Sequence, residues 1–370
     1  MRILILSDNV APYRIRWAEA LAKDNQVKFV AVKDKDALVN SSWLVKDSDS
    51  VEIIKLPSMV IKNNAITRNV AKYVKKHRKE TDVIIFDGYG TIPNVLGMLY
   101  CKRHKIPYYV NIDGVRIGHK ESFIARFLKK LVFSKYAYYL CGSDYSKDEL
   151  IKRGIAEEKI CVHNFTSLKE EELLAAPPTV KQKSQKKIEL GLLDLPTFMA
   201  VGRFVPLKQF DMVLKAFKPI CEKAQLLLIG EGAEEEKYRE IIDELDVKNV
   251  KIVEFMPLEK LKNYYYAGDC IILASNSEVW GMVVNEAMGY GATAVITSSR
   301  CVVGYSVINE GVNGYLFPFD EQDKLTEKMV KVLDGDLEKA KEESLKIIRD
   351  YTVEKTAERH LDFFDKTIKK

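Results

Sequence analysis

Short apolar runs alternate with amphipathic helical patterns along most of the chain. The runs RILILS, DVIIFD and IPYYVNI have the continuous apolar character of strands buried in a parallel sheet, and polar or glycine residues follow each of them. After Pro12 the spacing of Ile15, Trp17 and Leu21 gives one apolar stripe with helical period. This alternation of strand and helix predicts an α/β fold with parallel sheets.

Length and composition indicate two domains. At 370 residues the chain is too long for a typical single domain, and 47% hydrophobic with 30% charged residues is the composition of a globular enzyme. The segment AAPPTVKQKSQKK has two prolines and then polar residues without hydrophobic period, which predicts a linker. We therefore expect one α/β domain over 1–175, a linker over 176–187 and a second α/β domain over 188–351.

The sequence gives no sign of a targeting segment or a disulfide framework. The apolar core of MRILILSDNV is too short for a signal peptide, and no run reaches the roughly 18 apolar residues that span a bilayer, so we expect a cytoplasmic protein. The six cysteines lie far apart without paired spacing. This spacing predicts buried reduced thiols rather than a zinc site or disulfides.

Positive charge is concentrated in the first part of the chain. The net charge of +5 divides into +11 over residues 1–165 and −6 over the remainder. Two basic amphipathic stretches, 62–79 and 120–135, could rest on an anionic membrane, although most such faces are only solvated. The charge alone fits a nucleic acid, an anionic lipid, a phosphorylated substrate or a basic solvated face.

The most informative stretch is ASNSEVWGMVVNEAMGYGAT, residues 274–293. An apolar run predicts a strand, a short polar loop carries Glu278, and a helical pattern begins after Gly281. Free N–H groups at such a helix start favour an anion. Glu278 and Glu286 would be about 12 Å apart along a helix, which suits the two ends of a nucleotide-sugar whose diphosphate lies over the first amides. An arbitrary pair of glutamates is more often only solvated.

The surroundings of these two glutamates resemble the signature of glycosyltransferase family 4, a retaining family with the GT-B fold. SEVWGMVVNEAMGYG carries the pattern of Glu, seven residues and Glu, with an aromatic residue and Gly after the first Glu. The resemblance implies two Rossmann-like doubly wound domains facing across a cleft, with the donor mainly in the second and the acceptor mainly in the first. No metal or other cofactor is expected, because no DxD-type carboxylate cluster stands near the motif.

The resemblance also implies roles for particular residues. Arg203 and Lys208 stand where the family places two cations on the donor diphosphate, and two cations can stabilise the charge of the departing nucleotide. Glu278 is implied as a catalytic-site ligand of sugar hydroxyls and Glu286 as the ribose ligand. The further donor-binding candidates are Trp280, Gly281, Met282, Val283, Gly230 and Gly232.

The sequence departs from the family pattern at two positions. Asp113 follows a strand where many members have a histidine that contacts the reacting sugar, so Asp113 is expected to be either a contact to donor sugar or acceptor, or a structural turn. Gln209 replaces the glycine usual after the lysine. Arg14 and Arg116 are the acceptor-side candidates. A last helix at about 352–370 is expected to pack back on the first domain.

These features predict a retaining, metal-independent glycosyltransferase that moves a hexosyl or N-acetylhexosaminyl group from a nucleotide-sugar, with UDP expected first and GDP second. The FTSL tract at 165–168 resembles a tract at the same place in polysaccharide-assembly glycosyltransferases. Together with the basic first part, this resemblance favours a lipid-linked glycan acceptor in bacterial surface polysaccharide biosynthesis, at the inner face of the cell membrane. A non-catalytic GT-B-fold partner subunit is the alternative. An oxidoreductase would need GxGxxG after a first strand, which is missing, and a nucleic-acid partner would not explain the two glutamates.

Overall fold

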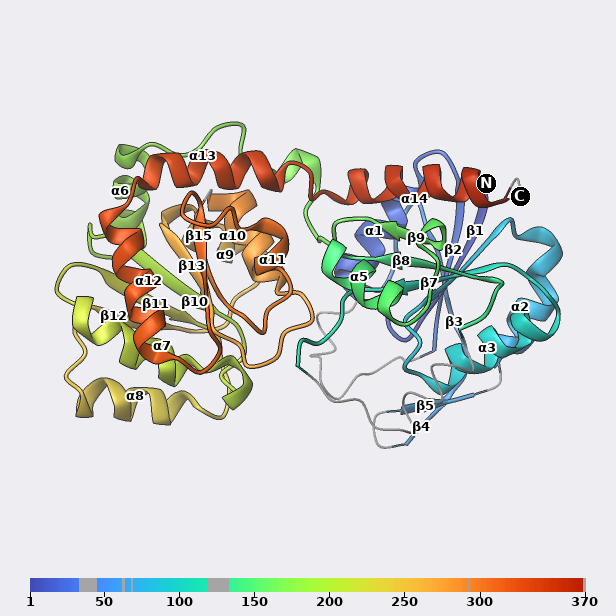
Figure 1. The fold of residues 1–370 in the computed structure, drawn as a ribbon, viewed down its shortest axis with the longest axis horizontal. Helices are drawn as coiled ribbons and strands as arrows, with labels where there is room; N and C mark the ends of the chain where they lie inside the picture. Colours follow the sequence, from blue (N-terminus) through green and yellow to red (C-terminus); the bar gives the residue numbers. More distant parts are fainter. Residues whose placement is uncertain (33–44, 62–63, 68, 119–132, 292, 369–370) are drawn as a thin grey trace. The chain divides into compact units, whose positions relative to one another are not determined.

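The chain folds into two compact units (Figure 1). A computed structural model describes residues 1–32, 45–61, 64–67, 69–118, 133–291 and 293–368. Unit 1 comprises Met1–Val115, His119–Lys169 and Thr352–Lys370, and unit 2 comprises Arg116–Gly118 and Glu170–Tyr351. Each unit is built on its own parallel sheet with helices on both faces, so the predicted α/β fold with two doubly wound domains is confirmed.

Unit 1 contains a seven-stranded sheet in the order β3-β2-β1-β6-β7-β8-β9, with parallel pairing throughout. The strands are β1 (Arg2–Ser7), β2 (Gln26–Ala31), β3 (Glu52–Lys55), β6 (Val83–Asp87), β7 (Tyr108–Ile112), β8 (Ala137–Cys141) and β9 (Ile160–Val162). A separate antiparallel pair consists of β4 (Met59–Ile61) and β5 (Asn64–Ile66). The strand order reverses between β1 and β6, and doubly wound proteins bind ligands at the carboxyl ends of the strands at such a point.

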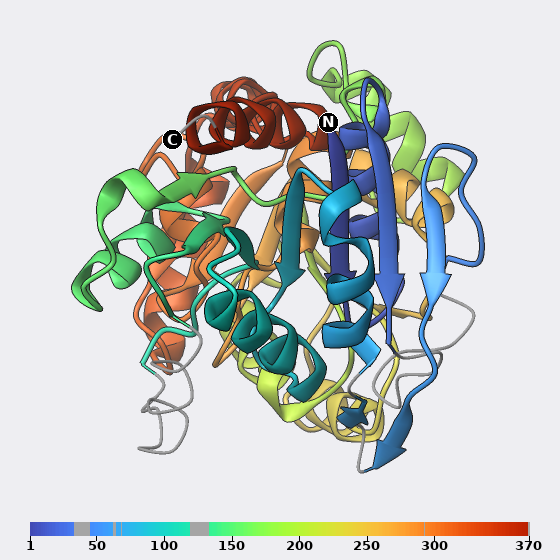
Figure 2. The ribbon, with the colours of Figure 1, turned by 90° about the vertical axis from the view of Figure 1, so that its right-hand side faces the viewer.

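Helices cover both faces of the unit 1 sheet, and Figure 2 shows two of them, α2 and α3, in front of the parallel strands. They are α1 (Pro12–Ala22), α2 (Asn69–His77), α3 (Ile92–Arg103), α5 (Asp144–Lys152) and α14 (Val353–Ile368). Val70, Met98 and Leu150 bring α2, α3 and α5 against one face. Trp17 and Phe364 bring α1 and α14 against the other. Burial of these apolar side chains is the main stabilising contribution to the unit.

The last helix, α14, is fixed to unit 1 by polar as well as apolar contacts. The Trp17 indole N–H donates to His360 Nδ1 at 3.0 Å. The Thr356 hydroxyl donates to the His163 carbonyl at 3.1 Å, and Thr367 Oγ1 lies 2.5 Å from the Tyr109 hydroxyl. Buried polar groups that are hydrogen-bonded in this way specify where a helix packs.

Unit 2 contains a six-stranded sheet in the order β12-β11-β10-β13-β14-β15, again with parallel pairing throughout. The strands are β10 (Thr197–Val201), β11 (Gln225–Ile229), β12 (Val250–Val253), β13 (Cys270–Leu273), β14 (Ala294–Ser298) and β15 (Gly314–Phe317). The helices are α6 (Val180–Glu189), α7 (Phe210–Phe217), α8 (Glu235–Glu244), α9 (Leu258–Ala267), α10 (Met282–Gly291), α11 (Gly304–Val307), α12 (Gln322–Asp334) and α13 (Leu337–Ile348). Here the order reverses between β10 and β13.

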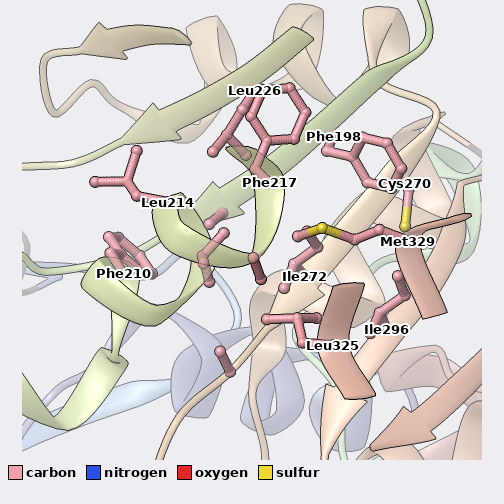
Figure 3. Close-up of a cluster of buried hydrophobic side chains, with 14 of the residues drawn as sticks. Phe198, Phe210, Leu214, Phe217, Leu226, Cys270, Ile272, Ile296, Leu325 and Met329 are labelled. Carbon is pink, nitrogen blue, oxygen red and sulfur yellow. The ribbon is translucent and has the colours of Figure 1, made fainter. Parts of the chain in front are cut away.

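One face of the unit 2 sheet packs against α7 and α12 (Figure 3). Phe198 on β10 meets Phe217 on α7 edge to face, with ring centroids 6.2 Å apart. Leu325 and Met329 on α12 are fully buried and lie over Ile296 on β14. Edge-to-face aromatic pairs and tight aliphatic packing fix the strands that carry the loops at the carboxyl edge.

The predicted linker over 176–187 is wrong in part, because Val180–Glu189 forms helix α6. Thr179 and Gln182 form a capping box at its start. Its inward face carries no apolar stripe because the buried positions are Lys183 and Lys187, which form ion pairs with Asp269 at 3.4 and 2.8 Å. Burial lowers the pKa of Lys183 to about 8, although the Asp269 carboxylate opposes that shift.

The cysteines have the state expected from their spacing. All six are buried and free, and burial raises the pKa of Cys141 to about 12. No helix in the described part of the chain is both long and apolar enough to cross a membrane.

Two histidines lie buried where α14 meets the sheet of unit 1. The rings of His163 and His360 meet with centroids 4.7 Å apart, and both are almost fully buried. His163 Nδ1 and His360 Nε2 have no hydrogen-bond partner in the described structure, and both residues line a cavity of about 20 Å³. Burial, reinforced by the charge of Arg359, lowers the pKa of His163 to about 3.

This burial predicts that the wild-type protein loses stability as the pH falls below 6.5. The unfolded chain binds a proton at His163 near pH 6.5, but the folded chain binds it only near pH 3. At pH 5 this difference should lower the free energy of unfolding by about 2 kcal/mol. The variant His163→Phe should not show this loss. The free energy of unfolding of both proteins is measured by urea unfolding at pH 7 and pH 5. His104→Phe, at an exposed position, is the control. Equal pH dependence of wild type and His163→Phe would contradict the prediction.

Candidate active site

The loop that carries the first glutamate connects β13 to α10, as the sequence predicted. Gly281 adopts a φ of +105°, and a Cβ atom there would lie 2.4 Å from Leu273 Cδ2. Only glycine fits this turn without displacing its neighbour. Helix α10 then starts at Met282, and its first amides have no acceptor within the helix. The turn therefore aims the amino end of a helix at the carboxyl edge of the sheet.

Lys208 and Glu278 form an ion pair at this edge. Lys208 Nζ lies 2.5 Å from Glu278 Oε2, and the two side chains are 16% and 21% exposed. Lys208 ends a short 3₁₀ turn, Pro206–Lys208, after β10. The Asn276 N–H donates to the Leu207 carbonyl at 2.9 Å, so the loops after β10 and β13 are joined by their main chains. The structure thus brings together two residues that are seventy positions apart.

Arg203 and Gln209 flank this lysine in the same loop. The Arg203 side chain is exposed, and none of the described residues forms an ion pair with it. Gln209 adopts the left-handed conformation, with φ 52° and ψ 40°, that glycine would adopt more easily. A side chain there costs about 1 kcal/mol. The turn nevertheless forms, so the missing glycine does not remove Lys208 from its place.

Glu286 lies one turn into α10 and is held by α9. The Tyr265 hydroxyl donates to Glu286 Oε2 at 2.9 Å. Burial, together with the charge of Glu286, raises the pKa of Tyr265 well above its ordinary value, so the hydroxyl remains a donor. One carboxylate oxygen is therefore fixed by the protein in a side chain that is only partly buried.

Three predicted donor contacts have another role in the structure. Trp280 is 2% exposed, donates to Asn285 Oδ1 at 3.2 Å and packs near Tyr351, so it holds the loop and cannot reach a ligand as the sequence analysis expected. A Cβ at Gly230 would lie 1.9 Å from the Gly202 carbonyl oxygen, and one at Gly232 would lie 2.4 Å from that of Phe204. These two glycines let the loops after β10 and β11 pack together.

Unit 1 has a buried polar cluster at its own reversal point. Arg14 Nε lies 2.6 Å from Asp87 Oδ2, and its Nη2 lies 3.8 Å from Asp113 Oδ2. The Asn111 amide donates to both carboxylates, at 2.9 and 3.3 Å, and the Tyr13 hydroxyl donates to Asp113 at 3.4 Å. Arg14 and Asp113 are candidates from the sequence, whereas Asp87 and Tyr13 are not. The position of Asp87 at a strand end was the available signal.

Asp113 is the carboxylate of this cluster that a ligand can reach. Its side chain is 26% exposed, against 1% for Asp87. Burial, followed by the charge of Asp87, raises the pKa of Asp113 to about 6. The other acceptor-side candidate, Arg116, is exposed and belongs to unit 2 with residues 116–118, so Arg14 and Arg116 lie in different units. Met282 and Val283 are partly exposed at the start of α10.

The comparisons with known proteins concern the fold of the chain and most of unit 2. Residues 181–349 match the family model described as Glycosyl transferases group 1. Two solved structures have the same fold. Anabaena Alr3699/HepE in complex with UDP has a TM-score of 0.76 and 17% identity, and the match covers 99% of this chain and 100% of that one. The lipopolysaccharide outer core galactosyltransferase WaaB has a TM-score of 0.71 and 17% identity, and the match covers 99% of each chain. The solved structures show that the chain has the GT-B fold, and the family match places a group 1 glycosyltransferase region at residues 181–349.

Two related sequences extend the comparison. An uncharacterized glycosyltransferase of Haemophilus influenzae is 27% identical over 287 residues, which are 76% of this chain and 73% of that protein. A 41.2 kDa protein in the cps region of Klebsiella pneumoniae is 25% identical over 230 residues, which are 62% of this chain and 56% of that protein. The family match spans the donor-side candidates of unit 2, while Arg14, Asp113 and Arg116 lie outside it.

The close approach at Gly230 predicts a large cost for a side chain there. Gly230→Ala should lower the free energy of unfolding by about 3 kcal/mol or more, because the new Cβ collides with backbone and the φ of +155° disfavours L-residues. Gly311→Ala is the control, since its φ of +79° is also positive but no atom lies within 4 Å of the added Cβ. It should cost about 1 kcal/mol. Equal losses in urea unfolding would contradict this packing role.

The raised pKa of Asp113 predicts that its charge destabilises the fold. The folded carboxyl keeps its proton up to about pH 6, whereas the unfolded one releases it near pH 3.8, so stability is lost as the pH rises through this window. Asp113→Asn should therefore be about 1 to 3 kcal/mol more stable than wild type at pH 8 and equal to it below pH 4. Urea unfolding at both pH values measures this. A variant that is less stable than wild type at pH 8 would overturn the electrostatic assignment.

Proposed function

We propose that the chain is a metal-independent, retaining glycosyltransferase of family 4 that transfers a hexosyl or N-acetylhexosaminyl group from a UDP-sugar. The observation that carries the proposal is the 2.5 Å pairing of Lys208 with Glu278 beside the amino end of α10. A cation for phosphate, a carboxylate for sugar hydroxyls and unpaired helix amides are thereby gathered at the reversal point of one sheet.

The donor lies along α10 in this proposal. The diphosphate binds the amides of Gly281, Met282 and Val283, while Lys208 and Arg203 offset its charge. The Glu286 carboxylate accepts hydrogen bonds from the ribose hydroxyls. The Anabaena relative of the same fold has structures in complex with UDP and with UDP-glucose, which supports uridine as the nucleoside.

The two cations act most strongly as the glycosyl bond breaks. The departing UDP gains negative charge, and positively charged groups already in place stabilise that charge without reorganising. The acceptor hydroxyl attacks the face from which UDP leaves and passes its proton to the departing phosphate, so the anomeric configuration is retained. A product with inverted configuration would contradict this part of the proposal.

The acceptor is a glycan, and we infer a lipid-linked one. Asp113 and Tyr13 of unit 1 supply a hydrogen-bond acceptor and a donor for its hydroxyls. The cps region of the Klebsiella relative and the lipopolysaccharide named for WaaB support bacterial surface polysaccharide biosynthesis. Lys72, Lys75 and Lys76 are exposed on α2 and would meet anionic lipid at the inner face of the cell membrane. Most of the second basic stretch, 120–135, lies outside the described residues.

A non-catalytic partner subunit is the second candidate. Asp113 in place of histidine and Gln209 in place of glycine favour it, because an inactive copy of the fold would tolerate both changes. The ordered Lys208–Glu278 pair and the held Glu286 favour the enzyme.

Titration calorimetry with UDP and GDP, without metal and with EDTA, tests the proposal. Wild type should bind UDP with micromolar affinity, and Glu286→Ala should weaken binding at least tenfold, about 1.4 kcal/mol, because the ribose loses its carboxylate. Glu244→Ala, at an exposed position on α8, is the control and should bind as wild type does.

The other outcomes separate the two candidates. Folded wild type that binds neither nucleotide would favour the partner subunit. Binding of UDP only after Mg²⁺ is added would contradict the metal-independent mechanism while leaving the glycosyltransferase in place.

A further inference from the structure

We propose that Glu278 acts as a built-in competitor for the phosphate-binding lysine, so that the Lys208–Glu278 pair must open before a nucleoside diphosphate binds. The inference rests on the proposed function, because it takes this edge of unit 2 as the donor site. In the structure the lysine is already occupied: its Nζ lies 2.5 Å from a carboxylate oxygen, with both side chains mostly shielded from water. A phosphate oxygen of the ligand and the Glu278 carboxylate therefore compete for the Lys208 ammonium group.

The main chains around the pair are fixed, so the pair opens by rotation of side chains. The Glu278 N–H donates to the Arg300 carbonyl at 3.3 Å, and Glu278 forms a β-bridge with Cys301. On the other side, the bond from Asn276 to Leu207 ties the lysine turn to the glutamate loop. Neither loop can withdraw from the other without breaking main-chain hydrogen bonds.

The lysine stem lies against a glycine and has an exposed arginine in the same loop. This stem runs past Gly202, where a Cβ atom would lie 3.4 Å from Lys208 Cε. Arg203 in the same loop is exposed and has no ion pair with a described residue, so it can meet the diphosphate first. Entry of the ligand then exchanges one anionic partner of Lys208 for another, and no charge is left unpaired on the lysine.

This exchange distinguishes a nucleotide-sugar from the free nucleotide. When a UDP-sugar binds, its phosphate pairs with Lys208 and its sugar hydroxyls donate hydrogen bonds to the released Glu278 carboxylate. UDP alone also has to open the pair, but it leaves the carboxylate with only water beside a diphosphate of the same charge. Glu278 thus favours donor over product and speeds the release of UDP, in addition to binding the sugar.

The test is the affinity for UDP, measured by titration calorimetry on the full chain. Glu278→Gln keeps the shape of the side chain and removes its charge, so the variant should bind UDP about three- to tenfold more tightly than wild type, because Lys208 is free. Glu278→Ala should shift the affinity in the same direction and serves if the glutamine variant does not fold. Glu327→Gln removes the same charge from an exposed ion-paired site on α12 and should leave the affinity unchanged.

A double-mutant cycle assigns the gain to the pair itself. In a Lys208→Met background, which should weaken UDP binding at least tenfold, Glu278→Gln should no longer improve it. An improvement that persists without Lys208 would overturn the inference, because general electrostatic repulsion would then explain it.

Failure of the inference and failure of the proposed function give different results. Wild type that binds UDP, with Glu278→Gln equal or weaker, would overturn the competitor role and leave the donor site intact. Absence of UDP binding in both folded proteins would remove the donor site and the inference with it.

Discussion

The arrangement of both units depends on one constraint: parallel strands bring all their carboxyl ends to the same edge of a sheet. Where the strand order reverses, the loops from two central strands diverge and leave polar groups accessible between them. In unit 1 this edge gathers Arg14, Asp87 and Asp113, and in unit 2 it gathers Lys208 and Glu278. Residues far apart in the sequence meet there because the strands that precede them are neighbours, or next to neighbours, in the sheet.

Charge is paired wherever the chain removes it from water. Asp269 forms ion pairs with two lysines of α6, and Asp87 forms one with Arg14. The side chains in these pairs are at most 15% exposed. A buried charge without a partner would cost several kcal/mol, so these pairs hold structure. The Lys208–Glu278 pair and Asp113 differ in being partly open to solvent. Like Arg203 and Glu286, they are charged groups that a ligand can reach, which separates the candidate site from the structural ion pairs around it.

The sequence failed where a tertiary contact decided a residue's role. Helix α6 has lysines on its inner face, so its hydrophobic period was absent and a linker was expected over 176–187. Gly230 and Gly232 were expected near a nucleotide, which stays a prediction, and only the structure shows that the loop after β10 packs against both glycines. Trp280 belongs to the signature, yet it is buried against Asn285. In each case the contact is with a residue outside the local sequence pattern, so the pattern could not predict the contact.

The sequence by itself determined the α/β class, the two domains and the strand–loop–helix that carries Glu278 and Glu286, because apolar runs and helical period are local properties of the chain. The resemblance to a known family added Arg203 and Lys208 as candidates. Only the tertiary structure decided that Lys208 meets Glu278 and that Asp87 and Tyr13 complete the cluster around Asp113. Those contacts depend on strand order and loop geometry, which set distances between residues that the sequence keeps far apart.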